Sequence, residues 1–163
     1  MTIRKAKGTD LEELLAIYNY EVEHGVATLD LQPKGLNEWW GWYNAHNIEN
    51  HPLLVAEEDG AVIGYASLSS YREKEAYKST VELSIYIHAK HRGRGVATAL
   101  MEAILAEARA DERTHTVVSV ITSGNVASEK LHEKFGFEYC GRIKEVGIKF
   151  DKYQDIDNYR LGV

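Results

Sequence analysis

One feature of the sequence constrains the fold most: a segment in which polar and apolar residues alternate strictly, followed by a glycine-rich turn and a predicted helix. The segment STVELSIYIH (residues 79–88) alternates polar and apolar side chains, which predicts a β-strand with one buried face. Its apolar positions are Val81, Leu83, Ile85 and Ile87, and its polar positions are Glu82, Ser84, Tyr86 and His88. The stretch HRGRG (residues 91–95, hereafter the glycine turn) follows and leads into a helix through about Ala110. This succession is typical of a mixed α/β protein.

The remaining segments predict the same class of fold. Two apolar runs around Asp59-Gly60, within residues 53–69, are typical of a β-hairpin. Further strands are expected at residues 2–5 and 115–123 and as a final pair within 137–161, and further helices at 8–24, 36–47 and 125–135. The order is βααβββαβαββ, so we expect one mixed α/β domain that spans residues 1–163.

Two of these helices carry patterns that predict how they pack. The helix after the glycine turn has an expected buried stripe made of Leu100, Ala103, Ile104 and Ala108. The helix at residues 36–47 carries the aromatic cluster Trp39, Trp40, Trp42 and Tyr43. We expect this cluster to cover a core, and the alternative is that it lines a substrate mouth or a partner surface.

The composition argues against several classes of function. Of the 163 residues 44% are apolar and the formal net charge is −6, which favours a packed domain over a general nucleic-acid binder. Cys140 is the only cysteine, so no internal disulfide is expected and a reducing cytoplasm fits the chain. No apolar run suggests a membrane span or a membrane partner. The seven histidines lack the spacing of a metal site, so we expect no metal.

The glycine turn has two interpretations on its own residues. Gly93 and Gly95 let a backbone approach a ligand closely, and the free N–H groups of the following helix favour an anion such as phosphate. Arg92 and Arg94 would add charge-assisted hydrogen bonds. The alternative is a flexible, solvated turn. The turn lacks the third glycine of a dinucleotide fingerprint and the Gly-Lys-Ser/Thr of a nucleoside-triphosphate loop.

At this point the sequence resembles the GCN5-related N-acetyltransferases (GNAT). RGRGVA at residues 92–97 matches the Gln/Arg-x-x-Gly-x-Gly/Ala pattern of that family, and NVASEKLHEKFGF is similar to its later segment. The stretches IYNYEVEHGVATLDLQP, AYKSTVELSIYIHAKHRGRG and LHEKFGFEYCGRIKEVGIKF resemble the phosphinothricin and methionine sulfoximine acetyltransferase branch. The resemblance implies a GNAT fold with splayed middle strands, a homodimer, and acetyl-coenzyme A as the cosubstrate.

The resemblance also implies which residues hold the coenzyme. The backbone of Ile85, Tyr86 and Ile87 is expected to pair with the pantetheine arm in the manner of an added strand. The turn and helix start are expected to hold the pyrophosphate; this set comprises Arg92, Gly93, Arg94, Gly95, Val96, Ala97 and Thr98. Asn125 and Lys134 match positions that contact the coenzyme in this branch, although a solvated helix lysine is the alternative for Lys134.

Acetyl transfer to an amine needs a base and a proton donor for the leaving thiolate. Glu82 is the expected base, because strand alternation places it opposite the apolar side chains and the branch has Thr-Val-Glu here. His132 stands where many GNAT members have a tyrosine that protonates the thiolate, so it is the expected donor or a second base. The alternatives are a surface glutamate and a helix histidine bonded to a backbone carbonyl.

The acceptor is the least constrained part of the prediction. Arg72, Lys74 and Tyr77 lie in the loop before the Glu82 strand, and in this branch that loop helps to bind the substrate. Basic side chains there would hold a carboxylate, and a solvated charged loop is the alternative. We therefore expect an N-acetyltransferase for a small amino acid or analogue. A polyamine, an aminoglycoside or a protein N-terminus are alternative acceptors, and a non-catalytic acyl-coenzyme A-binding module is an alternative function.

Overall fold

The computed structural model describes residues 1–163 and contains seven strands and four α-helices in the predicted order. The elements are β1 (Thr2–Lys5), α1 (Leu11–His24), α2 (Leu36–Asn44), β2 (Leu53–Glu58), β3 (Ala61–Ser70), β4 (Thr80–Ile87), α3 (Val96–Ala110), β5 (Thr116–Thr122), α4 (Val126–Lys134), β6 (Glu138–Lys149) and β7 (Lys152–Gly162). The fold class predicted from the sequence, a mixed α/β fold, is confirmed. No helix is long and apolar enough to cross a membrane.

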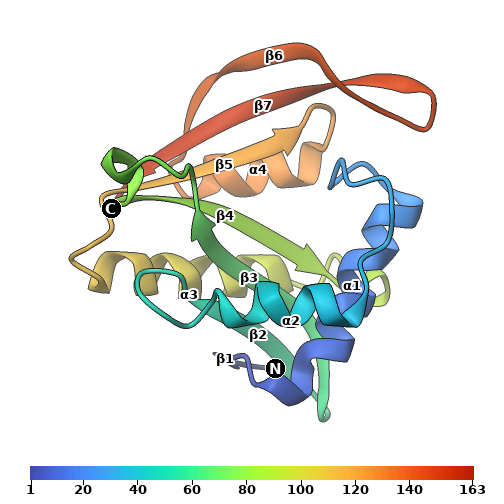
Figure 1. Cartoon of the computed structure of the whole chain (residues 1–163), viewed down its shortest axis with the longest axis vertical. Coiled ribbons are helices and arrows are strands. Elements are labelled where there is room, and N and C mark those ends of the chain that lie inside the picture. The colour runs from blue at the N-terminus through green and yellow to red at the C-terminus, as the bar shows by residue number, and fades with distance from the viewer.

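All seven strands belong to one sheet that splits in its middle. The strand order is β1-β2-β3-β4-β5-β7-β6, and β4 with β5 is the parallel pair in an otherwise antiparallel sheet. These two strands pair over three residues, Thr80 to Glu82 against Thr116 to Val118, and then diverge (Figure 1). The expected splayed middle strands are therefore present, and they leave a wedge that opens toward the carboxyl end of β4.

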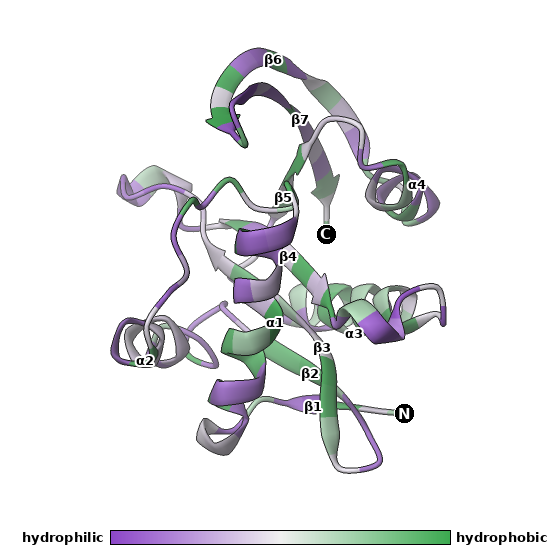
Figure 2. Ribbon diagram, turned by 90° about the vertical axis from the view of Figure 1, so that its right-hand side faces the viewer, coloured by the Kyte–Doolittle hydropathy of each residue, from purple (hydrophilic) through white to green (hydrophobic).

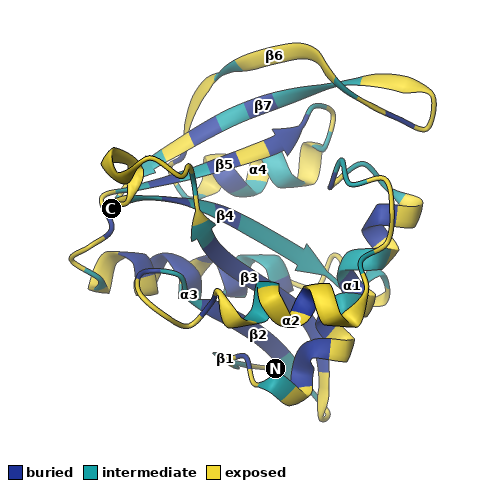
Figure 3. Ribbon diagram, viewed as in Figure 1, coloured by how far each residue is buried: buried dark blue, intermediate teal, exposed yellow.

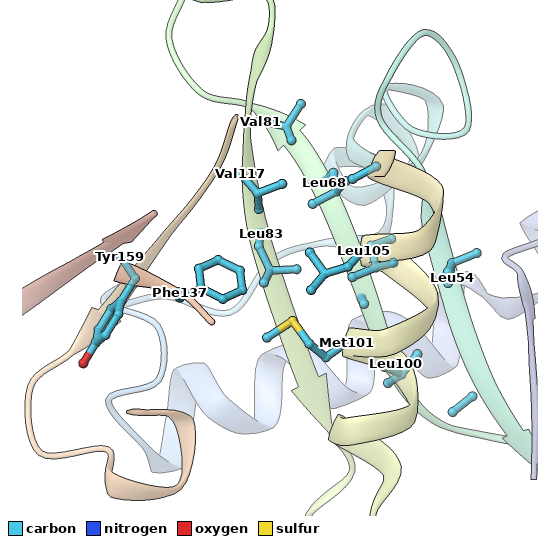
Figure 4. Close-up of a cluster of buried hydrophobic side chains, with 14 of the residues drawn as sticks. Leu54, Leu68, Val81, Leu83, Leu100, Met101, Leu105, Val117, Phe137 and Tyr159 are labelled. Atoms are coloured by element: carbon cyan, nitrogen blue, oxygen red, sulfur yellow. The ribbon is translucent and has the colours of Figure 1, made fainter. Parts of the chain in front are cut away.

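The helices cover both faces of the sheet. Helices α1 and α2 lie on one face, and α3 and α4 lie on the other (Figure 2). On the α3 face, buried residues of the helix pack against β2, β3, β4 and β5 (Figure 4). Leu100, Ile104 and Ala108 of the predicted stripe are buried there, whereas Ala103 is half-buried. Met101 and Leu105 widen the stripe, because α3 lies flat on a sheet whose surface is apolar on both sides of the helix axis.

A second core lies beneath α1 and α2. Leu11, Leu14 and Ile17 of α1 are buried with Trp39 of α2 against β2 and β3. Trp39 stacks on Trp42 with 4.1 Å between ring centroids, while Trp40 is exposed. The aromatic cluster thus covers a core, as expected.

The β6–β7 hairpin is the least covered part of the molecule. Strand β6 is exposed along most of its length and forms an edge of the sheet (Figure 3). Its far end reaches back toward the carboxyl end of α1, where Lys149 is buried (Figure 1). The hairpin therefore closes one side of the wedge between β4 and β5.

Candidate active site

A cavity of about 920 Å³ occupies the wedge between β4 and β5. Its walls come from β4, from the glycine turn with the first turn of α3, from β5, from α4, and from the end of α1 with the loop after it. The β6–β7 hairpin adds Val146 and Ile156. These parts meet only because β4 and β5 stop pairing after Glu82 and Val118. A cavity of this size holds a ligand of several hundred daltons.

The open edge of β4 presents backbone groups to the cavity. The N–H of His88 bonds the carbonyl of Ile63, and β3 pairs with β4 in antiparallel register. Backbone groups alternate in such a ladder, so those of Tyr86 turn toward β3 and those of Ile85 and Ile87 turn away from it. Strand β5 does not pair with β4 beyond Glu82, which leaves Ile85 and Ile87 free to pair with a ligand. Tyr86 lines the cavity as well, but not through a free backbone edge.

Glu82 lies where the two strands separate. Its side chain is half-buried and lines the cavity, and no salt bridge or side-chain hydrogen bond engages it. Burial raises the pKa of the Glu82 carboxyl, and no neighbouring charge offsets this effect. The carboxylate thus has the raised basicity and the free lone pairs that a general base needs.

The glycine turn forms the other end of the cavity. Gly93 and Gly95 have φ of +72° and +82°, a region that side chains rarely adopt, and an added Cβ at either would meet nothing within 4 Å. Gly95 also caps α3, so the N–H groups at the helix start lack partners inside the helix. Together with the helix dipole they make this end suited to an anion.

The two arginines of the turn point in different directions. Arg92 lines the cavity, and its guanidinium donates to the buried Glu21 carboxylate of α1. The guanidinium of Arg94 lies outside the cavity lining and binds both oxygens of Glu58, at 2.9 and 2.8 Å. Arg94 therefore ties the turn to the β2–β3 hairpin, and no direct contact with a ligand in the cavity is indicated for it.

Helix α4 supplies the third wall. Asn125 caps this helix, with its side-chain oxygen accepting from the Ser128 N–H at 3.2 Å, and it lines the cavity together with Lys134. His132 is buried beside them. Its Nδ1 lies 2.7 Å from the Ser128 carbonyl oxygen and its Nε2 lies 2.7 Å from Ser119 Oγ.

The bonding of His132 determines its tautomer. A carbonyl oxygen only accepts, so Nδ1 must carry a proton, and in the neutral ring Nε2 accepts from the Ser119 hydroxyl. Burial lowers the pKa of His132. The ring is therefore neutral near pH 7 and has no free N–H, which matches the expected alternative of a helix histidine bonded to a backbone carbonyl.

Comparison with known proteins identifies the family. Residues 11–137 match the acetyltransferase (GNAT) family. The chain belongs to this family. An L-methionine sulfoximine/L-methionine sulfone acetyltransferase of Salmonella typhimurium is 36% identical to this GNAT chain over 161 residues, which are 99% of this chain and 94% of that protein.

Solved structures of other GNAT proteins have the same fold. A phosphinothricin acetyltransferase from Sinorhizobium meliloti, solved in complex with acetyl-coenzyme A, superposes with a TM-score of 0.95 at 32% identity, covering 99% of this chain and 88% of that one. A ribosomal-protein-alanine N-acetyltransferase from Brucella melitensis superposes with a TM-score of 0.96 at 37% identity, covering 100% of both chains. The GNAT fold expected from the sequence is thus confirmed, and the splayed strands are its central feature.

The structure brings most of the predicted site residues of this GNAT domain together, but not all. Arg72, Lys74 and Tyr77 lie in the β3–β4 loop (residues 71–79), are exposed, and do not line the cavity. The Arg72 guanidinium lies over the rings of Tyr71 and Tyr77, at 5.0 and 5.8 Å from their centroids. This loop is self-packed, so any contact with an acceptor would be made outside the cavity walls. No group of three or more His, Cys, Asp or Glu side chains is placed to hold a metal ion.

Sequence reasoning missed Glu21, Ser119 and Lys149. A signal for Glu21 was available, because it follows Leu14 and Ile17 at helical spacing and so places a charge on the buried face of α1. Ser119 carried a weaker signal. It is a polar residue between Val118 and Val120 on a predicted strand, so its side chain lies on the opposite face from theirs. Nothing in the sequence distinguishes Lys149 from a solvated strand lysine.

The tautomer of His132 is a testable prediction. Two-dimensional NMR of protein labelled with ¹⁵N-histidine is expected to show a neutral His132 ring protonated at Nδ1 near pH 7. Its titration midpoint is expected below the ordinary value of about 6.5, because burial disfavours the imidazolium. The stability that follows from this neutral ring is present above about pH 6.5 and is lost as the pH falls through the lower folded pKa. A ring protonated at Nε2, or a midpoint above that of an exposed histidine, would contradict the assignment.

Proposed function

We propose that this protein is an acetyl-coenzyme A-dependent N-acetyltransferase for the primary amine of a small amino acid or analogue of the methionine sulfoximine or phosphinothricin type. The observation that carries the proposal is Glu82, a half-buried carboxylate without a partner at the point where β4 and β5 separate. The names of the GNAT relatives agree with this acceptor class. The chemistry needs a neutral amine, and an unpaired basic carboxylate removes its proton.

The cavity fits the coenzyme. Acetyl-coenzyme A supplies the activated thioester. The unpaired backbone of Ile85 and Ile87 would pair with an extended arm and leave N–H groups to polarise a carbonyl. At the glycine-turn end of the cavity, Gly93 and Gly95 leave an open space that a side chain would fill, and we call this space the anion cradle. The N–H groups of Val96, Ala97 and Thr98, at the start of α3, lie beside it. Arg92, Asn125 and Lys134 are the proposed polar contacts there, and Arg94 holds the turn in place.

The proposed proton path involves Glu82 first and His132 second. Glu82 accepts the ammonium proton, directly or through water. His132 has no free N–H, so it is better suited to accept a proton from the Ser119 hydroxyl than to donate one to the thiolate. The bonds of His132 thus support a role in holding Ser119, or in relaying a proton away from the amine.

The acceptor would enter beside the loop that joins α1 and α2. Ala27, Thr28 and Leu29 of this loop line the same cavity as Glu82. Arg72 and Lys74, with Tyr77, are the proposed contacts for the acceptor carboxylate at the cavity rim. A second candidate acceptor is a protein N-terminus: a polypeptide extends out of a cavity toward such an exposed loop, and the Brucella melitensis relative carries a name of that kind.

A homodimer in the cytoplasm completes the proposal. The β6–β7 hairpin exposes several large apolar side chains, namely Tyr139, Ile143, Val146, Ile148 and Tyr153. Exposed apolar side chains that gather on one element are a feature of protein–protein contacts. Val146 also lines the cavity, so a second copy seated there would help to close the site. Sedimentation velocity at micromolar concentration is expected to return twice the chain mass of 18.4 kDa. The single exposed cysteine, Cys140, is compatible with a reducing compartment.

An acceptor panel tests the function. Methionine sulfoximine or phosphinothricin is expected to release free thiol from acetyl-coenzyme A well above the rate with buffer alone. A variant with both Arg72→Gln and Lys74→Gln should raise KM for these acceptors, because two cations near their carboxylate are lost. Unchanged KM would favour the protein N-terminus, tested with an alanine-initiated peptide. Coenzyme binding without thiol release on any amine would instead indicate a non-catalytic module.

Replacing the proposed base tests its role. Glu82→Gln is expected to lower kcat by about 10²–10⁴ while the affinity for acetyl-coenzyme A stays within about twofold. In the unmodified protein kcat/KM should fall as the pH drops through the Glu82 pKa, which burial places above its ordinary range, because a protonated carboxyl accepts no proton. This acid limb should be absent in the variant. Near-normal turnover by Glu82→Gln would remove Glu82 from the mechanism.

A pair of glycine variants tests the anion cradle. Gly95→Val is expected to weaken coenzyme A binding by at least about tenfold, because the β-branched side chain disfavours the left-handed conformation and fills the space beside the N–H groups. Gly60→Val is the matched control, since Gly60 has φ of +79° and open surroundings in the β2–β3 turn. Both variants should lose similar stability in thermal melts. Equal coenzyme affinity in the two would reject the cradle.

A further inference from the structure

Two buried charged residues lie beside the cavity, and neither has a role in the proposed chemistry. Glu21 near the end of α1 and Lys149 at the end of β6 are 7% and 3% exposed. The Glu21 carboxylate accepts from Arg92, and Lys149 Nζ donates to the Thr28 carbonyl at 2.8 Å and to the Glu21 carbonyl at 3.4 Å. We call Glu21, Thr28, Arg92 and Lys149 the Glu21 junction. It joins α1, the α1–α2 loop, the glycine turn and β6.

Lys149 is held in place by neutral groups. A buried ammonium is costly unless it is hydrogen-bonded, and its bonded partners here are two backbone carbonyls. Burial lowers the pKa of Lys149, while the nearby Asp30 and Glu21 carboxylates oppose this effect. One ammonium therefore fixes two carbonyls that belong to different segments, the last turn of α1 and the loop that lines the acceptor side of the cavity.

Two glycines permit the close packing at the junction. A Cβ at Gly25 would lie 2.8 Å from Glu21 Oε2, so a side chain at this position would displace the carboxylate that binds Arg92. A Cβ at Gly147 of β6 would lie 2.8 Å from Leu29 Cδ1. The α1–α2 loop is thus pressed between α1 on one side and β6 on the other, beside the cavity that Ala27, Thr28 and Leu29 line.

Arg92 lines the cavity and retains donors that are not bonded within the protein. Only one of its terminal nitrogens bonds Glu21, and an arginine side chain offers five N–H groups. Its side chain is half-exposed, whereas that of its partner is almost buried. The buried carboxylate therefore sets the direction of the exposed guanidinium.

We propose that Glu21 and Lys149 are positioning residues that align the two substrate sites: Glu21 orients Arg92 toward the coenzyme phosphates, and Lys149 holds the α1–α2 loop against the acceptor. The inference rests on the proposed function for its acceptor half, and on coenzyme binding alone for its donor half. Neither side chain needs to touch the reacting atoms. Their loss should therefore change affinity more than kcat, and each should change a different affinity.

The donor half is tested by calorimetry with coenzyme A. Glu21→Gln is expected to weaken coenzyme A binding about tenfold, because a charge-assisted hydrogen bond to Arg92 is lost. Glu23→Gln, an exposed change on the same helix, is the matched control and should bind as the unmodified protein does. In an Arg92→Gln background the Glu21→Gln effect should vanish. An unaltered affinity in Glu21→Gln, or an equal effect in both backgrounds, would overturn this half.

The acceptor half is tested by steady-state kinetics with methionine sulfoximine. Lys149→Met is expected to raise KM for the amine about tenfold and to leave coenzyme A affinity within about twofold. It releases the Thr28 carbonyl and the longer bond to the Glu21 carbonyl, but the Glu21 carboxylate still binds Arg92 and Glu21 stays within α1. Lys144→Met, an exposed change on the same strand, is the control. Gly147→Ala, which presses on Leu29 from β6, should show the same split and serves if Lys149→Met does not fold. Parallel losses of both affinities would overturn the proposal.

The experiments distinguish a failure of either half of this proposal from a failure of the proposed function. If the unmodified protein acetylates no amine in the panel, the function is wrong, and the calorimetric result on Glu21 still supports or overturns its own half. If the amine is acetylated and Lys149→Met and Gly147→Ala both keep the normal KM, the function stands and the positioning role of Lys149 is wrong.

Discussion

The short parallel pairing of β4 and β5 is the constraint on which the rest of the molecule depends. Three residue pairs join these strands, whereas β4 pairs with β3, and β5 with β7, over seven pairs each. Each half of the sheet is thus held by its own full ladder, and the separation of the halves breaks neither. The backbone groups left open on β4 are tolerable only because they face a cavity that water or a ligand can enter. If β4 and β5 paired along their whole length, the sheet would have no room for a coenzyme. Glu82 would then not lie at a point where two strands separate.

Ion pairs then fix the position of the groups around that opening. The glycine turn is basic in a chain of net charge −6, yet each of its arginines is bound to a carboxylate from another element, Glu21 or Glu58. The pair with Glu58 is exposed and contributes little to stability. Its value lies in restricting a turn whose glycines would otherwise sample many conformations, since a preordered anion site loses less entropy on binding.

The sequence predicted the element order because each element carried its own hydrophobic period or was bounded by turn residues. It predicted that Glu82 lies opposite the apolar face of its strand, because alternation decides on which side of a strand a residue lies. It did not predict which backbone groups of β4 are free. That depends on the partner strand, and the register with β3 turns Tyr86 away while it exposes Ile85 and Ile87. The direction of Arg94 depended likewise on Glu58, distant in sequence. Long cationic side chains are the residues least determined by local pattern, because their position follows from partners that only the tertiary fold supplies.

Burial without countercharge sets the chemistry of the cavity. It raises the pKa of Glu82 and lowers that of His132, so the uncharged forms of both groups are favoured and their basicities approach each other. An alkylammonium that entered the same surroundings would be subject to the same effect, and its pKa would fall toward that of Glu82, the proposed base. The pKa of the ammonium and that of the Glu82 carboxyl would thus move toward each other, which lowers the free energy needed to transfer the proton from one to the other. A salt-bridged glutamate at position 82 would forfeit this advantage, since a cationic partner would stabilise the carboxylate and widen the gap again.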